Sequence, residues 1–225
     1  MIQRINSFLS KEGYTISKVE RKDLNNFTIS ITKAYNNKNP FIGIDEMVKN
    51  GEADKYLSVG DKFYIPELVI PSDTELKIKR RTIKNVEVVI IKVNPDSVLF
   101  NFEDSLFKTS ILLKEEVENI KTFEDSRLYH YLNYNFLANL ATAINVQSVS
   151  CSLLTEEEVL NSNYFGKRKN RIKLINGEGL SGFWLSTRED TESRVPWFKC
   201  YNFQGVLDSE IGYDPRGVSP TFLLF

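Results

Sequence analysis

The sequence contains only two cysteines and one histidine among its 225 residues. Cys151 and Cys200 lie far apart and neither belongs to a C-x-x-C pair, so they indicate neither a zinc site nor a disulfide framework. We expect both to be free thiols in the core of a protein kept in a reducing environment. His130 has no nucleophile or acid at a spacing that indicates a catalytic triad, and we expect it to be a solvated or partly buried structural residue.

Long apolar runs and an excess of one charge are also missing. No stretch reaches about 18 apolar residues, so the sequence predicts no membrane-spanning segment. Residues 1–17 lack the apolar centre of a secretory signal, so we expect synthesis in a cytoplasm without export. The 29 Lys and Arg residues nearly balance the 30 Asp and Glu residues, for a net charge of −1. That balance argues against a general nucleic-acid binder, which needs surplus cations.

The sequence predicts no metal or cofactor site. Its scattered carboxylates form no D-x-D-x-D-G calcium loop, and Gly177 and Gly179 lack the third glycine of a dinucleotide-binding loop. The basic run at 167–173 has the charge to contact phosphate or an acidic sugar. An acidic run at 156–158 lies just upstream, which favours a solvated, ion-paired face instead.

Hydrophobic residues make up 41% of the chain, enough to fill a core. Apolar residues recur every four positions from 125 to 144 and predict an amphipathic helix, at Leu128, Leu132, Phe136, Leu140 and Ile144. Thr155 followed by three glutamates predicts the capped start of another helix. Residues 74–102 are strand-like, with a hairpin turn at 94–96, and the chain beyond 180 contains strand signals only. The fold class predicted is therefore α+β with a β-rich C-terminal end.

The first 40 residues are predicted to form a separate arm. Apolar spacing favours a short helix at 2–9, followed by strands around Tyr14–Ile16 and Phe27–Ile31 with a turn at 25–26. The polar loop at 35–40 ends in proline and marks the boundary. We therefore expect an arm at 1–40 and a single domain at 41–225.

The C-terminal segments 182–190, 195–208 and 212–225 combine aromatic rings, arginines and turn residues, a mixture suited to recognition of sugars or proteins. Part of this C-terminal region must fill the core, and we expect burial of Trp184 and of the final strand at 221–225. The remaining core candidates are Leu185, Val206 and Val218.

Several motifs resemble those of an uncharacterised bacterial and phage domain family. They are LLTEEEV (153–159), YFG (164–166), FWLSTRED (183–190), FQGVLD (203–208), GVSPTFLL (217–224), SRLYHYLN (126–133) and the leader at 41–66. Chains of this family read W-W-L-R-S and end in G-V-R-P-A-L, and the leader is similar to that of gut-phage members. In this sequence the first family arginine is either replaced by Ser186 or displaced to Arg188. The second is replaced by Ser219.

The resemblance implies a C-type-lectin-like or formylglycine-generating-enzyme-like fold whose C-terminal loops present a binding face. It implies a non-enzymatic phage virion protein, tail- or capsid-associated, that binds a host-surface glycan or protein or decorates the particle. The arm would then dock on other virion proteins. The alternatives are an enzyme of the formylglycine-generating type, although Cys151 and Cys200 lack its copper-binding motif, and a purely structural oligomer subunit.

We expect the ligand contacts to come from surface loops flanking the core motifs. Trp197 follows Pro196, which stiffens the chain, yet the ring is equally suited to filling the core. The candidate ligand-binding residues are Arg188, Glu189, Arg194, Trp197, Tyr201, Gln204, Tyr213, Asp214 and Arg216.

Overall fold

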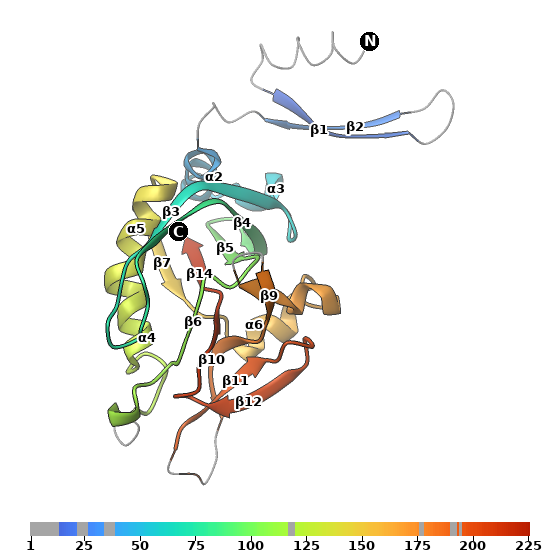
Figure 1. Ribbon diagram of the computed structural model, residues 1–225. Coiled ribbons are helices and arrows are strands. Elements are labelled where there is room, and N and C mark those ends of the chain that lie inside the picture. The colour runs from blue at the N-terminus through green and yellow to red at the C-terminus, as the bar shows by residue number, and fades with distance from the viewer. Residues whose placement is uncertain are drawn as a thin grey trace.

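The computed structural model describes most of the chain, and the predicted helix at 2–9 lies outside its described residues. The described residues are 14–21, 27–33, 39–116, 120–175, 178–189, 193 and 195–225. Near the N-terminus, β1 (Tyr14–Arg21) and β2 (Phe27–Lys33) form an antiparallel two-stranded sheet of their own, as the alternating apolar residues predict. Figure 1 shows this hairpin at one end of the molecule, beyond α2 (Pro40–Lys49).

The first large sheet has five antiparallel strands. Its order is β3 (Lys62–Ile70), β4 (Arg81–Asn94), β5 (Ser97–Phe102), β14 (Thr221–Leu224) and β7 (Val149–Ser152). The hairpin turn predicted at 94–96 joins β4 to β5, which confirms it. The C-terminal strand therefore lies inside the sheet rather than at its edge.

Burial of the last strand is confirmed at Thr221, Phe222 and Leu224, whereas Leu223 is half-buried and the final residue is exposed. Phe222 and Leu224 are 1% and 0% exposed, whereas Phe225 is 55% exposed. Leu224 is the last residue paired with β7, so the side chain of Phe225 leaves the sheet. On the core side Phe100 and Phe222 stack with ring centroids 4.8 Å apart, and Phe41 of α2 packs on both rings. This aromatic cluster therefore packs the first helix of the domain, α2, against its last strand, β14.

The predicted helix at 125–144 is confirmed, and its five stripe residues are all 0% exposed. It begins at Ser126, whose hydroxyl accepts from the backbone N–H of Tyr129, and ends at Asn145 in the left-handed region. Its middle turn is π-helical, which the sequence did not predict. The helix comprises α4 (Arg127–His130), the π-helical segment η2 (Tyr131–Phe136) and α5 (Leu137–Ile144).

The second sheet is formed mainly by the C-terminal part of the chain. Its order is β12 (Leu207–Ile211), β11 (Trp197–Tyr201), β10 (Phe183–Glu189), β13 (Arg216–Val218) and β6 (Phe107–Thr109). Trp184 is fully buried as predicted, and its indole N–H donates to the carbonyl of Thr109 at 3.0 Å. The core assignment of Val206 is wrong, because it lies in the turn between β11 and β12 and is 51% exposed.

Helix α6 (Glu156–Asn161) begins at Thr155 with a reciprocal capping box to Glu158, which confirms the predicted start. It packs with β10 over a smaller apolar cluster that includes Val89, Phe165 and Leu185. Shorter elements complete the chain: α3 (Ala53–Tyr56), η1 (Lys114–Glu116), η3 (Arg168–Arg171), β8 (Lys173–Ile175) and β9 (Glu178–Ser181). The chain is of the α+β class, with only strands beyond residue 180 among the described residues.

Two chain segments cross between the sheets side by side. Residues 103–106 lead from β5 to β6, and residues 219–220 lead from β13 to β14 (Figure 1). Backbone hydrogen bonds from Phe102 to Pro220 and from Leu106 to Val218 join them. We call this crossing the sheet junction, and a group of charged side chains lies around it.

Candidate functional site

A buried lysine lies beneath the sheet junction. Lys173 is 1% exposed, and its Nζ donates to Asn101 Oδ1 at 2.7 Å and to the carbonyls of Phe102 and Glu103 at 2.5 and 3.1 Å. The ammonium also lies 5.1 Å from the ring centroid of Phe183. Burial lowers the pKa of Lys173 to about 8, opposed by the charges of Glu103 and a neighbouring aspartate. With three acceptors the ammonium is fully hydrogen-bonded, which indicates a structural role.

The two serines that replace arginines of the resembled family both have internal hydrogen bonds. Ser219 donates to the carbonyl of Phe102 at 2.7 Å, beside the Lys173 ammonium. Ser186 donates to the carbonyl of Leu154 at 3.2 Å. Buried acceptors near Ser219 are therefore satisfied by a serine and a lysine together.

A network of two carboxylates, one lysine and two tyrosines lies above Lys173. Lys62 forms ion pairs with both Glu87 and Glu103, the latter at 3.4 Å. Tyr64 donates to Glu87 at 3.0 Å, and Tyr164 donates to Glu103 at 2.5 Å. Burial and the hydrogen bond to Glu103 raise the pKa of the Tyr164 phenol far above its usual value.

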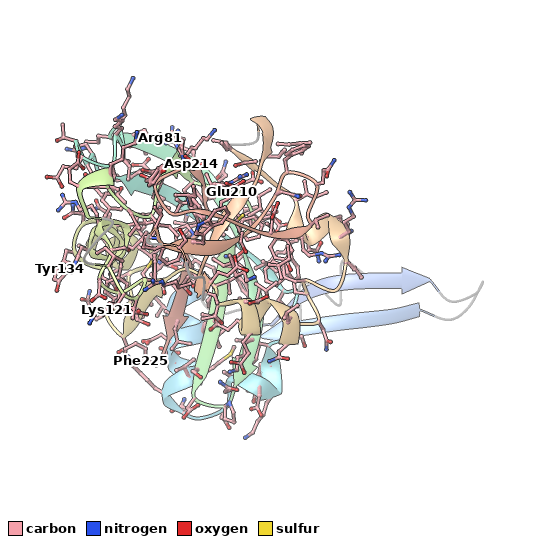
Figure 2. The ribbon with its side chains drawn as sticks, turned by 90° about the horizontal axis from the view of Figure 1, so that it is seen from below. Arg81, Lys121, Tyr134, Glu210, Asp214 and Phe225 are labelled. Atoms are coloured by element: carbon pink, nitrogen blue, oxygen red, sulfur yellow. The ribbon has the colours of Figure 1, made fainter. Side chains whose placement is uncertain are left out.

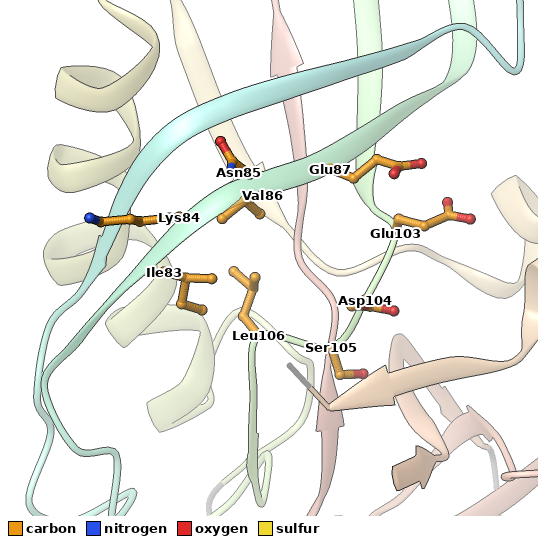
Figure 3. Close-up of a pocket in the computed structure, with 9 residues that line it drawn as sticks. All are labelled: Ile83, Lys84, Asn85, Val86, Glu87, Glu103, Asp104, Ser105 and Leu106. Carbon is orange, nitrogen blue, oxygen red and sulfur yellow. The ribbon is translucent and has the colours of Figure 1, made fainter. Parts of the chain in front are cut away.

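One depression, of about 290 Å³, opens where β4 separates from the junction (Figure 3). The last backbone hydrogen bond between the two segments runs from Glu103 to Glu87, and beyond it Ile83, Val86 and Leu106 face the gap. Asn85, at the same place in β4, has a φ of +53°. We call this the acidic depression, because its described lining residues include three carboxylates and a single lysine. They are Glu87, Glu103, Asp104 and Lys84.

A second depression, of about 460 Å³, lies on the other side of Glu103 and has the opposite charge. We call it the basic depression. Its polar lining residues are Lys62, Glu103, Asn163, Tyr164, Lys167, Lys169 and Asn170.

A third depression, shallow and of about 450 Å³, surrounds an exposed tyrosine. Tyr134 is 73% exposed in the π-helical segment, and its ring stacks on His130 with centroids 5.8 Å apart. Figure 2 shows Tyr134 at the periphery of the molecule. The Tyr131 hydroxyl donates to the carbonyl of Pro71 at 2.7 Å and ties the helix to the end of β3. We call this group the Tyr134 platform; its other lining residues are Val69, Pro71, Ser72, Arg80, Asn135 and Asn139.

Comparison with family models, curated proteins and solved structures finds no match for this chain. In the part of the chain that the structure describes, no three His, Cys, Asp or Glu side chains are grouped to hold a metal ion. No helix among those residues has both the length and the apolar character to cross a membrane.

The structure corrects the placement of the predicted ligand-binding residues in loops. Five of them lie in strands: Arg188 and Glu189 in β10, Trp197 and Tyr201 in β11, and Arg216 in β13. Tyr201 is only 2% exposed and packs on Phe183, so its assignment to the surface is wrong. In β11 Phe198 and Cys200 are fully buried, and the alternation of a strand explains the pattern better than a loop does.

The other predicted residues are dispersed rather than gathered in one place. Arg194 lies outside the described residues. Gln204 is exposed in the β11–β12 turn, and Tyr213 and Asp214 lie in the turn that leads to β13. None of the eight described residues lines the three depressions described above.

Several of the nine are engaged with neighbouring side chains. Arg216 forms an ion pair with Glu210, and Glu189 pairs with Lys199 at 3.0 Å. A hydrogen bond from Ser209, followed by that of Lys199, lowers the pKa of Glu189. Arg188 donates to the backbone carbonyl of Lys121 at 2.7 Å. Half-buried Trp197 pairs with Glu189 across the strands, and this is the only cross-strand pair among the nine in the described registers.

Sequence reasoning missed the Tyr134 platform because its residues come from the end of β3, from Arg80 and from a helix. Tyr134 belongs to none of the sequence motifs described above. The π-helical turn that exposes its ring also leaves no signal in the spacing of apolar residues. The basic depression did have a signal, the run at 167–173, which contains two of its lysines.

Proposed function

We propose that this chain is a non-enzymatic phage virion protein with a C-type-lectin-like domain that binds a host-surface glycan through the Tyr134 platform. The exposed ring within a shallow polar depression is the observation that carries this proposal. A tyrosine provides a rigid apolar face on which a sugar ring stacks, with a hydroxyl at its edge.

The side chains around the ring are suited to sugar hydroxyls. Arg80, Ser72 and Asn135 are exposed and have no side-chain partner among the described residues. Asn139 donates to the carbonyl of Asn135 at 2.9 Å, which leaves its own side-chain oxygen free to accept. Planar amide and guanidinium groups beside an aromatic face supply both donors and acceptors.

The remaining parts of the proposal come from the resemblance in sequence. A virion protein would use the β1–β2 hairpin and the rest of the arm at 1–40 to dock on other virion proteins. The localisation proposed is therefore the phage particle, assembled in the cytoplasm of the host. Mass spectrometry of purified particles tests this part, and absence of the chain from the particles would contradict it.

The glycan-binding part is tested with purified full-length protein on an array of bacterial surface saccharides. We expect Tyr134→Ala to lose array binding while its melting temperature stays unchanged, because a residue so exposed contributes little to stability. Tyr56→Ala is the matched control, since Tyr56 is 53% exposed in α3 and should leave binding intact. Loss of binding in Trp197→Ala but not in Tyr134→Ala would place the binding face on β11 instead.

A further inference from the structure

The basic run at 167–173 has two kinds of side chain. Three of its five basic residues have internal contacts: Lys173 is buried, Arg168 donates to the carbonyl of Gln204 at 2.8 Å, and Arg171 lies 5.9 Å from the ring centroid of Tyr201. The ammonium groups of Lys167 and Lys169 are exposed and have no partner among the described residues. Both line the basic depression.

The basic depression has a net positive charge in a chain whose net charge is −1. Among the described residues, Lys62, Lys167 and Lys169 line it against Glu103; Lys62 is paired with Glu87 and Glu103, so the unpaired positive charge comes from Lys167 and Lys169. Asn163 and Asn170 add two amide groups to the lining. The concentration of cations around a concave surface attracts anions of small size.

The depression is built on a segment that is held in place. Asn170 donates through its side chain to the carbonyl of Tyr164 at 2.7 Å, and its backbone N–H donates to the carbonyl of Lys167 at 2.9 Å. Tyr164 is itself fixed by Glu103, which also positions Lys62. The lysine stems and amides are therefore presented from a rigid base, which lowers the entropy lost when a ligand binds.

We propose that the basic depression is a second binding site, for a phosphate monoester carried on a sugar-sized polar molecule. A phosphate monoester has a charge of about −1.5 to −2 near pH 7, which matches the two unpaired ammonium groups of Lys167 and Lys169. Lysines bind phosphate as point charges, and the cations among the described lining residues are all lysines. The amides of Asn163 and Asn170 are placed to bind hydroxyls of the sugar, and about 460 Å³ accommodates a monosaccharide.

The probe is glucose 6-phosphate, titrated into the full-length protein and followed by amide chemical shifts in heteronuclear NMR spectra. We expect saturable shifts at Asn163, Lys167 and Asn170, and affinity that falls steeply with added salt. Glucose, glucuronate and inorganic phosphate are the comparison ligands and should bind more weakly. Equal binding of glucuronate or of free phosphate would overturn the proposal, as would the absence of any shift with glucose 6-phosphate.

Two variants test the residues. We expect the double variant Lys167→Ala/Lys169→Ala to lose about tenfold in affinity or more, because two charge-assisted contacts are removed. Lys108→Ala is the matched control, since Lys108 is an exposed lysine in β6 outside the depression. Glu103→Gln keeps an oxygen that accepts from the Tyr164 hydroxyl and removes the negative charge, so it should strengthen binding. Unchanged affinity in the double variant would overturn the proposal. Tyr134→Ala should leave this binding unaffected, so this site and the glycan platform are tested independently.

Discussion

The Nζ of Lys173 lies 2.7 Å from Oδ1 of Asn101, in a part of the core where neither residue is accessible to solvent. This contact connects the short strand β8 to the centre of the first sheet, since Asn101 pairs with Thr221 in β14. Among the described residues, the ammonium has carbonyl and amide acceptors but no carboxylate within hydrogen-bond distance. The hydrogen bonds to its charge therefore come from dipoles, and burial makes the protonation of Lys173 sensitive to folding.

Stability should depend on the protonation of Lys173 between pH 8 and 10.5. Burial lowers the pKa from its usual value of 10.5 to about 8, so in this range the unfolded chain binds more protons than the native protein. The free energy of unfolding contributed by this residue therefore rises with pH, by about 3 kcal/mol across the window. Urea denaturation at several pH values measures it, as the difference between the wild type and Lys173→Met.

The comparison with Lys173→Met is needed because burial also raises the pKa of the Cys151 thiol. Above pH 9 this thiol makes the free energy of unfolding fall as the pH rises, which is opposite to the effect of Lys173. Lys108→Met is the control for replacing a lysine by methionine, at an exposed position in β6. A difference between wild type and Lys173→Met that stays flat from pH 8 to 10.5 would contradict the prediction.

Trp184→Ala should cost about 3–5 kcal/mol of unfolding free energy, because it removes a fully buried indole and leaves a cavity. The carbonyl of Thr109 also loses its hydrogen bond. Chemical denaturation measures the loss, with Trp197→Ala as the comparison because Trp197 is only half-buried. A cost below about 1 kcal/mol for Trp184→Ala would mean that the residue does not fill the core as described.

Gly217→Ala should destabilise the protein by about 1–3 kcal/mol, because the site has no room for a methyl group. A Cβ at position 217 would lie 2.5 Å from the hydroxyls of both Ser105 and Ser181 and 2.7 Å from the carbonyl of Gly182. Gly166→Ala meets a single atom at 3.3 Å and should be tolerated much better. Thermal denaturation compares the two variants, and an equal fall in melting temperature would show that crowding at position 217 is not the cause.

Both cysteines should react slowly with a thiol reagent such as dithionitrobenzoate in the native state. Cys151 and Cys200 are buried, and burial raises the pKa of Cys200 to about 12, so the reactive thiolate is scarce at pH 8. Addition of urea should release two thiols per chain. Rapid modification of either cysteine in folded protein would contradict the burial that the structure describes.

The sequence by itself determined the elements whose residues interact with near neighbours along the chain. The helix at 125–144 follows from apolar residues spaced every four positions, and α6 follows from Thr155 and Glu158, which cap each other within one turn. The β4–β5 hairpin follows from a local turn. Burial of Trp184 and Phe222 was also predictable, because large aromatic residues in apolar strands have few other environments.

Only the tertiary structure decided which residues distant in sequence come into contact, both in the core and at the surface. Glu87 and Glu103 come together through Lys62, and Lys173 reaches Asn101, because strands distant in sequence pair in the same sheet or cross at the junction. The position of Tyr201 between two recognised motifs placed it on a surface loop, whereas strand pairing buries it against Phe183. Such contacts depend on register and sheet order, which result from the packing of the whole core and leave no pattern within any one segment of the sequence.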